Sequence, residues 1–337
     1  MRYRRIAGTD VDVSEVGFGV WTVATGWWGE YSDHQAVTLL RQAFDRGVTF
    51  FDTADTYGNG RGETLLAQAF PGSDRDDIVI GTKFGYDWQP TIGQRREGHR
   101  EAPHRLDIPF LEAALDDSLR RLDTDRIDLW QLHNVRIEHL QRDEMWTFLD
   151  RVKRDGKVRA VGVALGPAIG WCEEGVYALT ERPVDALQMI YNALELDPGR
   201  ELIDVARRTG RSLIVRVPHS SGMLEGRYTE DTAFAPNDHR NHRPRAWLTN
   251  GLKKIEQLRF LTDGTGSTLG QAALRYVLHD PAVVSALPNV YDLEQLDEFA
   301  TASDCADLTA GDVARIKELF EANYGLPREQ EQAVAAQ

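Results

Sequence analysis

The sequence predicts an α/β fold, a (β/α)8 TIM barrel. Short apolar segments that read as buried strands alternate with helical segments along almost all of the 337 residues, and such alternation is typical of parallel strands with right-handed crossovers. Eight such units close into a barrel. The strand segments are 17–21, 48–52, 77–82, 126–132, 158–164, 185–189, 212–217 and 282–287. The alternative, an open doubly wound sheet, would need a G-x-G-x-x-G fingerprint after the first strand, and Val20-Trp21-Thr22 breaks that pattern.

The elements begin with a predicted hairpin at the amino terminus. Residues 3–19 alternate apolar and polar side chains around the turn Ala7-Gly8-Thr9-Asp10, a pattern typical of a β-hairpin. The first helix starts at a capping box, Ser32 to Gln35, and ends before Gly47. Later helices are expected at 62–70, 108–122, 142–154, 172–180, 198–209, 245–263 and 267–279, followed by extra C-terminal helices at 292–303 and 309–322. We expect residues 1–326 to form one barrel domain and residues 327–337 a polar tail.

Composition and charge narrow the classes of function. The formal net charge is -14, and so acidic a surface repels phosphate backbones, which excludes nucleic acid as an expected partner. The basic stretch 239–245 is a local exception; it reads as a solvated loop or as the lining of an anionic substrate's path. Two cysteines without C-x-x-C spacing indicate no disulfide framework. No apolar run approaches the roughly 20 residues that cross a bilayer, and no signal-peptide pattern opens the chain. We expect a cytoplasmic protein with a small-molecule substrate, and a homo-oligomer is compatible with the sequence.

Four ionisable residues stand at or just beyond the ends of predicted strands: Asp52, Tyr57, Lys83 and His133. Parallel strands deliver such residues to one end of a barrel, where the active sites of this fold lie. A phenol is a weak acid with a pKa near ~10, and an ammonium or imidazole beside it stabilises the phenolate. Tyr57 could then exchange a proton with a carbonyl or alcohol oxygen, while Asp52 pairs with Lys83. This set suits carbonyl chemistry without a metal.

Each of the four residues also has an ordinary structural interpretation. A single tyrosine after a strand usually packs, a lysine or histidine at a strand end is common, and an aspartate there often caps the next turn. The functional interpretation depends on all four occurring together at one end of a set of apolar strands.

Several stretches of the chain resemble the aldo-keto reductase family. They are VGFGVW (16–21), FDTADTYG (51–58), GETLLAQAF (62–70), IGTKFG (80–85), residues 111–133, GKVRAVGVA (156–164), LQMIYN (187–192) and VPHSSGMLEGRY (217–228). Their order and spacing are closer to the bacterial and potassium-channel-β branch than to the mammalian aldose reductases. The resemblance implies a metal-free oxidoreductase in which Tyr57 is the general acid and Asp52, Lys83 and His133 complete a tetrad. It also implies a nicotinamide dinucleotide, NAD(P)(H), bound across the carboxyl end of the barrel.

The resemblance further implies which residues bind that cofactor. Gln188 would hold the carboxamide, and Arg216 would replace an aromatic ring that stacks on the nicotinamide, since a guanidinium is also planar. Residues 217–221 would face the pyrophosphate, largely through backbone groups. The expected cofactor contacts are Gly19, Val20, Trp21, Asp52, Ala164, Gln188, Arg216, Val217, Pro218, His219, Ser221, Asn289, Gln295 and Glu298.

Two departures from the family pattern concern the cofactor. Ala164-Leu165 stands where the family usually has Ser-Asn, so two side-chain contacts to the carboxamide are lost and Ala164 would contact the cofactor through its backbone. The stretch 287–300 contains no Arg or Lys, where users of NADP(H) usually have one, and a 2′-phosphate needs charge-assisted donors. We therefore expect NAD(H) to be favoured over NADP(H), with Gln295 and Glu298 at the adenosine end.

An aromatic wall is expected on the substrate side. The expected substrate contacts are Trp21, Trp27, Trp28, Tyr57, Trp88, His133 and Asn134, with Tyr31 and Phe84 as candidates for the wall or the core. The substrate is expected to be an aldehyde, a ketone, a sugar or a polyol. His219 is a candidate for a substrate contact or for a polar loop residue. Two other functions stay open: a cofactor-sensing regulatory subunit resembling the potassium-channel β subunit, and a carbohydrate-binding barrel without chemistry, against which the intact tetrad argues.

Overall fold

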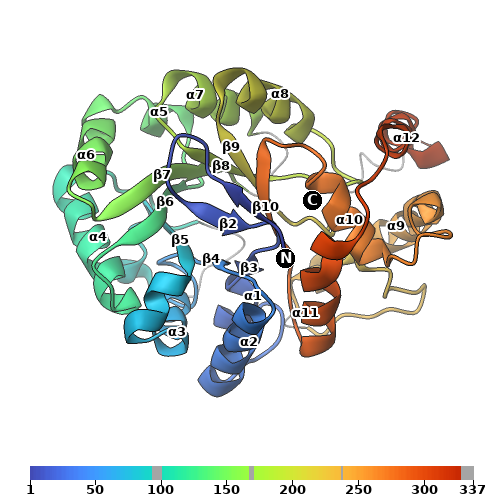
Figure 1. Cartoon of the computed structure of the whole chain (residues 1–337), viewed down its shortest axis with the longest axis horizontal. Helices are drawn as coiled ribbons and strands as arrows, with labels where there is room; N and C mark the ends of the chain where they lie inside the picture. Colours follow the sequence, from blue (N-terminus) through green and yellow to red (C-terminus); the bar gives the residue numbers. More distant parts are fainter. Residues whose placement is uncertain (93–100, 167–170, 237, 328–337) are drawn as a thin grey trace.

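Eight parallel strands form the barrel that the sequence predicts. The computed structural model describes residues 1–92, 101–166, 171–236 and 238–327. Strands adjacent in the chain are adjacent in the sheet (Figure 1), and a parallel bridge between Val16 and Ala286 links its two edges. The strands are β3 (Phe18–Gly19), β4 (Phe50–Asp52), β5 (Val79–Phe84), β6 (Ile127–His133), β7 (Val158–Ala164), β8 (Ala186–Ile190), β9 (Ser212–Arg216) and β10 (Val283–Leu287).

Helices alternate with these strands and cover the outside of the barrel (Figure 1). In α4, for example, Leu111, Leu115 and Leu122 are buried at helical spacing, and the Asp107 side chain caps the first turn. The α-helices are α1 (Trp21–Ala24), α2 (Asp33–Asp45), α3 (Arg61–Ala69), α4 (Ile108–Leu122), α5 (Ile137–Leu140), α6 (Asp143–Arg154), α7 (Cys172–Glu181), α8 (Gly199–Thr209), α9 (Arg245–Glu256), α10 (Leu269–Val277), α11 (Leu293–Ala300) and α12 (Ala310–Glu321).

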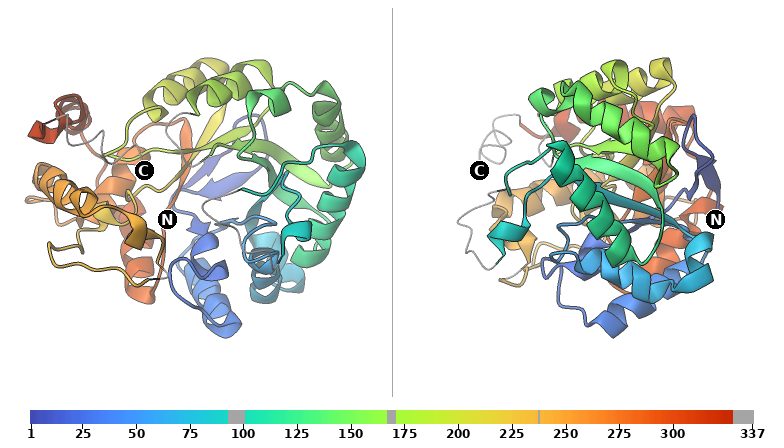
Figure 2. Two further views of the ribbon diagram at one scale, coloured as in Figure 1. Left: turned by 180° about the vertical axis from the view of Figure 1, so that it is seen from behind. Right: turned by 90° about the vertical axis from the view of Figure 1, so that its left-hand side faces the viewer.

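The predicted hairpin closes the amino end of the barrel. Its strands β1 (Tyr3–Arg5) and β2 (Asp12–Ser14) pair in antiparallel fashion. Ile6, Val11 and Val13 are buried in one cluster with residues of the barrel strands, including Val79 and Ile214. The right-hand view of Figure 2 shows the hairpin at one end of the barrel and the long segment after β9 toward the other. The hairpin therefore leaves the carboxyl ends of the strands for the site.

Several predicted boundaries are wrong, and each has a local cause. The expected strand 17–21 is only two residues long, because the chain turns into α1 at Trp21, where the Val20 amide donates to Asp52 O at 2.9 Å. The single helix expected at 245–263 is interrupted after Glu256 and resumes as a 3-10 turn, Arg259–Leu261. The helix expected at 292–303 likewise ends as α11 before the 3-10 helix Thr301–Asp304. The expected tail lies almost entirely outside the described residues.

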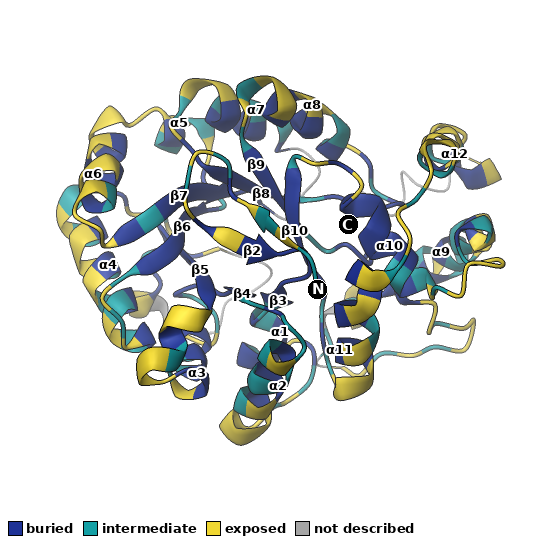
Figure 3. Cartoon of the chain, in the orientation of Figure 1, coloured by how far each residue is buried: buried dark blue, intermediate teal, exposed yellow. Residues whose placement is uncertain are grey.

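The barrel strands are buried on both faces. Most of their residues are dark blue in Figure 3, whereas the outward faces of the surrounding helices are exposed. This burial explains why the strands read as apolar runs. None of the helices in the described part of the chain combines the length and the apolar composition that a membrane span requires.

Candidate active site

The structure brings Asp52, Tyr57, Lys83 and His133 together at the carboxyl end of the barrel. Asp52 and His133 are the last residues of β4 and β6, Lys83 is next to last in β5, and Tyr57 lies in the turn after β4. Lys83 Nζ is 2.5 Å from Asp52 Oδ1 and 4.9 Å from the centre of the Tyr57 ring. The ring centres of Tyr57 and His133 are 6.0 Å apart. The expected pairing of Asp52 with Lys83 is confirmed.

Three side chains donate to the Asp52 carboxylate. Lys83 donates to Oδ1, while Gln131 Nε2 and Gln188 Nε2 donate to Oδ2 at 3.0 and 2.8 Å. All of these side chains are buried, and charge-assisted hydrogen bonds of this kind fix the orientation of a carboxylate. The sequence prediction misses Gln131. A signal was present, because Gln131 precedes His133 by two residues in β6 and alternate residues of a strand share a face.

Electrostatics give Lys83 and His133 different protonation states. Burial opposes the charged form of Lys83, but the carboxylate of Asp52 and the phenol of Tyr57 outweigh it, so the pKa of Lys83 is raised. Burial, together with the positive charges of Lys83 and Arg216, holds the pKa of His133 well below its usual value. Lys83 is therefore an ammonium near pH 7, whereas His133 is neutral and keeps one ring proton to donate.

The turn between β4 and α3 fixes the position of Tyr57. Gly58 has a φ of 60°, and a Cβ there would lie 2.4 Å from the carbonyl oxygen of Ala24, so the turn requires glycine. Asp55, in the same turn, accepts a hydrogen bond from Trp88 Nε1 at 3.2 Å. Burial is the main cause that raises the pKa of Asp55 well above its usual value. Trp88, one of the expected wall residues, is thereby tied to the turn that carries Tyr57.

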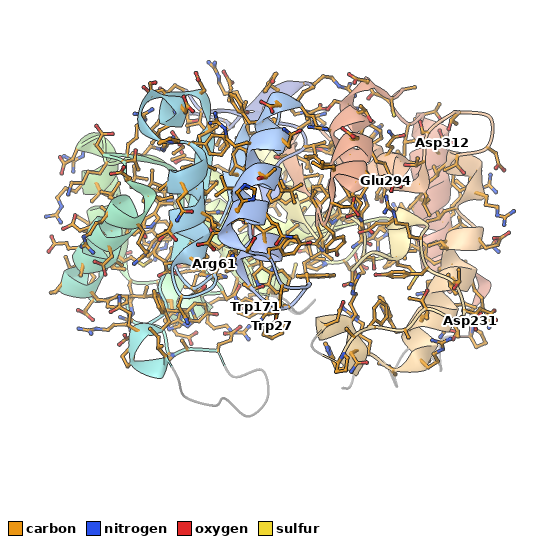
Figure 4. All side chains as sticks on the ribbon, turned by 90° about the horizontal axis from the view of Figure 1, so that it is seen from below. Trp27, Arg61, Trp171, Asp231, Glu294 and Asp312 are labelled. Carbon is orange, nitrogen blue, oxygen red and sulfur yellow. The ribbon has the colours of Figure 1, made fainter. Side chains whose placement is uncertain are left out.

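The other expected wall residues lie in the segment after β3. The ring of Trp21 is centred 6.5 Å from that of Tyr57, 6.1 Å from that of Trp27 and 5.7 Å from that of Trp28. Trp27 is 45% exposed and is labelled in Figure 4 at the end of the molecule opposite the hairpin. Phe84, by contrast, is fully buried and stacks on an indole of the core. The structure thus brings Trp21 to Tyr57 and assigns Phe84 to the core.

The backbone just beyond β9 is strained. Val217, Ser220 and Ser221 have φ values of 55°, 49° and 56°, a region that is particularly unfavourable for valine. Such strain clusters at functional sites, and turns of this kind can direct successive N–H groups at an anion. The segment therefore fits the pyrophosphate contact expected from the sequence.

Arg216 and His219 leave this segment in different directions. Arg216 Nη2 donates to Leu165 O at 2.8 Å, and the guanidinium interacts electrostatically with Tyr57, so it faces the tetrad. His219 is buried instead against α10 and α11, where its Nε2 lies 3.0 Å from Gly270 O. Burial lowers the pKa of His219 to about 4. Its side chain belongs to the packing there, and a cofactor contact would come from its backbone.

The residues expected at the adenosine end lie on α11 and are engaged within the protein. Gln295 Nε2 donates to Glu225 Oε2 at 2.8 Å. Arg227 Nη2 lies 3.3 Å from Glu298 and 3.4 Å from Glu294. Arg227 comes from the chain after β9, so a cation does reach this region although residues 287–300 contain none. Two carboxylates share its charge.

The remaining expected cofactor residues lie at the same end of the barrel as the tetrad. Gly19 is the register partner of Asp52, and Ala164 is the register partner of Gln188. Asn289 Oδ1 accepts a long hydrogen bond, 3.4 Å, from the side chain of α1 residue Thr22. Together with the strained turn after β9, these positions fit an extended dinucleotide. In the described part of the chain, no group of three or more His, Cys, Asp or Glu residues is arranged to hold a metal ion.

Comparison with known proteins identifies the family of this chain. The model of the aldo/keto reductase family matches residues 15–321. Aldo-keto reductase YhdN of Bacillus subtilis (strain 168) is 28% identical over 301 residues, which are 85% of this chain and 84% of that protein. The NADH-specific methylglyoxal reductase of Escherichia coli (strain K12) is 27% identical over 322 residues, or 93% and 97% of the two chains. The holo form of aldo-keto reductase AKR11C1 from Bacillus halodurans superposes with a TM-score of 0.75 at 26% identity and covers 95% of this chain and 96% of that one. The chain therefore belongs to the aldo/keto reductase family.

Proposed function

We propose that this chain is an NAD(P)(H)-dependent oxidoreductase that interconverts the carbonyl of an aldehyde, ketone or sugar and the corresponding alcohol, with Tyr57 as general acid and base. The observation that carries the proposal is the position of Lys83, whose Nζ lies 2.5 Å from Asp52 and 4.9 Å from the centre of the Tyr57 ring. A buried ammonium beside a phenol stabilises the phenolate that remains when the proton has left.

When bound along the turn after β9, a nicotinamide dinucleotide would supply the hydride that a carbonyl carbon needs in the direction of reduction. Tyr57 donates its hydroxyl proton to the carbonyl oxygen, and Lys83 stabilises the phenolate. Asp52 balances the charge of Lys83 and, held by its two glutamine donors, keeps the ammonium directed at the phenol. His133, which is neutral, donates a hydrogen bond that orients the same oxygen. In oxidation, the phenolate takes the proton from the alcohol.

The first test replaces the proposed acid. Tyr57→Phe keeps the ring but removes the proton, so turnover should fall by roughly 10²–10⁴, the usual contribution of a positioned acid or base. Turnover is followed as the change in absorbance of the reduced nicotinamide, and cofactor binding by tryptophan fluorescence. Tyr3→Phe, in the hairpin at the opposite end of the barrel, is the matched control. Full activity of Tyr57→Phe would rule out this assignment.

We further propose that NAD(H) is preferred to NADP(H). A 2′-phosphate at α11 would meet Arg227, but the charge of that residue is already shared by Glu294 and Glu298, and Asp292 adds a third carboxylate at the start of the helix. Arg240 also acts on this region, but it forms an ion pair with Asp238, so the local balance is acidic and a dianionic phosphate is disfavoured. The NADH-specific name of the Escherichia coli relative is consistent with this preference.

The preference is tested by titrating both dinucleotides. Wild-type protein should bind NADH more tightly than NADPH, and the double variant Glu294→Gln, Glu298→Gln should gain affinity for NADPH because Arg227 is freed. Arg227→Ala should reverse that gain in the background of the double variant. Tighter binding of NADPH by the wild-type protein would contradict the charge argument and leave the tyrosine assignment intact.

A further inference from the structure

Arg61, the first residue of α3, joins the end of α1 to the start of α2. Its Nη1 donates to Val23 O at 2.8 Å and to Ala24 O at 3.3 Å, and its Nη2 donates to Tyr31 O at 2.7 Å. Its Nε donates to Asp33 Oδ1 at 2.9 Å. A guanidinium is a planar fork of donors, so it can bridge several acceptors at once. One side chain therefore ties together both ends of the segment between the two helices.

The hydrogen bonds to carbonyl groups matter more than the ion pair. The Asp33 side chain is 59% exposed, and exposed ion pairs contribute little to stability. Val23 and Ala24 are buried, and buried carbonyl groups need partners. They end α1, which has only four residues. So short a helix is not stable alone, and its last carbonyl groups lack partners within the helix. The position of α1 therefore depends on Arg61.

This helix and the segment after it carry the aromatic wall beside Tyr57. Trp21 is the first residue of α1, and its ring is centred 6.5 Å from that of Tyr57. Trp27 and Trp28 follow in the segment that Arg61 holds, and both rings contact that of Trp21. Figure 4 labels Arg61 and Trp27 toward the same end of the molecule. A shift of α1 would therefore move the wall relative to the phenol.

The turn that carries Tyr57 packs closely against α1. A Cβ at Gly58 would lie 2.4 Å from Ala24 O, and a Cβ at Gly62 would lie 3.4 Å from Ala24 Cβ. Arg61 stands between these two glycines, four residues after Tyr57. The backbone on both sides of Arg61 thus touches the end of α1, and the guanidinium fastens the same contact. The wall and the proposed acid are held as one unit.

We propose that Arg61 is a positioning residue, which fixes the wall of Trp21, Trp27 and Trp28 against Tyr57 and thereby sets the affinity for the carbonyl substrate. The inference rests on the proposed function. The donors of Arg61 are directed at the segment that it holds, so it acts through that segment and takes no part in proton transfer.

The test separates substrate affinity from chemistry. In Arg61→Ala, KM for 4-nitrobenzaldehyde should rise by at least about tenfold, which is equivalent to about 1.4 kcal/mol, or one hydrogen bond of support for the wall. The value of kcat should stay within about threefold of the wild type, because Tyr57 keeps its own surroundings. Millimolar guanidinium should lower KM of this variant again, since it supplies the donors that were removed.

A second variant and a matched control make the test specific. Arg61→Lys should raise KM by at least about threefold, because one ammonium cannot span the carbonyl groups at both ends of the segment. This variant decides the matter if Arg61→Ala does not fold. Arg41→Ala is the control, since Arg41 Nη1 donates to Ala69 O at 2.9 Å and to Asp74 Oδ2 at 2.6 Å near the other end of α3. It should leave KM unchanged.

Quenching of tryptophan fluorescence by acrylamide gives a readout that needs no turnover. Trp28 is only 7% exposed, and loss of Arg61 should make its indole accessible, so the quenched fraction should rise in Arg61→Ala. The rise should be absent when Trp28→Phe is added. Arg41→Ala should be quenched like the wild-type protein.

Each outcome bears on a different statement. An unchanged KM in both Arg61 variants, a loss confined to kcat, or an equal effect of Arg41→Ala would overturn the positioning role while leaving the proposed function standing. If wild-type protein turned over neither 4-nitrobenzaldehyde nor propanal, with NADH or with NADPH, the proposed function would fall, and with it the role of Arg61 in substrate affinity. Unchanged quenching in Arg61→Ala would show that Arg61 does not hold the wall.

Discussion

Glu225 offers a sharp test of the electrostatics around α11. It ends the 3-10 helix Met223–Glu225 and is 7% exposed. Gln295 donates to its Oε2 at 2.8 Å, and its Oε1 has no partner in the described part of the chain. Burial raises the pKa of this carboxyl to about 8, although the charges of Arg240 and Arg227 oppose the rise. Glu225 is therefore mostly protonated in the folded protein at pH 7.

The raised pKa makes stability depend on pH in a defined direction. In the unfolded chain the carboxyl titrates near its ordinary value of 4.5, so between pH 4.5 and about 8 the folded state binds more protons than the unfolded state. Stability contributed by this group is present below that window and is lost as pH rises through it, by about 1.4 kcal/mol per pH unit. From pH 5.5 to pH 8.5 the loss amounts to about 3 kcal/mol.

Glu225→Gln removes the titration but keeps the size of the side chain. Between pH 5.5 and pH 8.5 the free energy of unfolding of the variant should rise by about 3 kcal/mol relative to that of the wild-type protein. For 337 residues the entropy of unfolding is about 0.7 kcal/mol per degree, so the gain corresponds to roughly 4 °C in Tm. Glu318→Gln, on the exposed face of α12, is the control and should show no such trend. A change in Tm for Glu225→Gln that is the same at both pH values would refute the reasoning.

Three further variants test other parts of the structure. Gln131→Met removes a hydrogen-bond donor to Asp52, which lowers stability, and also removes a buried amide oxygen without a partner, which raises it. Each effect is about 1–3 kcal/mol, so the two should nearly cancel and Tm should stay unchanged. The value of kcat should fall by about tenfold, because Asp52 is less firmly oriented. Gly58→Ala should cost about 1–3 kcal/mol more than Gly8→Ala in urea unfolding, since both have positive φ but only Gly58 would clash. The buried imidazole of His219 has a pKa of about 4, so between pH 6.5 and about 4 the unfolded chain binds a proton that the folded protein does not, and stability falls as the pH is lowered. His219→Leu removes this group and should therefore lessen the loss of Tm over that pH range.

The barrel and the clustering of Asp52, Lys83 and His133 at one end of it could be predicted from the sequence because their signals are local and repeated. The catalytic roles of these residues were implied by the family resemblance and stay predictions. Every barrel strand is buried on both faces, as in β6, where all seven residues are buried, so each reads as an apolar run bounded by polar residues. Parallel register then aligns the ends: Asp52 pairs with Gly81, and Lys83 pairs with Gln131. A polar residue at the end of one strand must therefore lie near the corresponding residue of its neighbour.

Contacts between distant segments could not be predicted in this way. Arg227 and Glu298 are 71 residues apart in the chain, and no periodicity relates the segment after β9 to α11. The absence of a basic residue from 287–300 was visible in the sequence, but the cation that reaches the same place from elsewhere was not. The orientation of His219, which faces α10 and not the tetrad, depends likewise on helices that follow it by 50 residues or more.

Chemistry and specificity depend on different parts of this fold. The carboxylate of Asp52 is oriented by Lys83, Gln131 and Gln188, which come from three other strands whose register the barrel fixes. Trp27 and Arg227, in contrast, follow α1 and β9 in connecting segments, where sequence can change without disturbing that register. A relative that is 27% identical can therefore share the fold and still differ in substrate and cofactor.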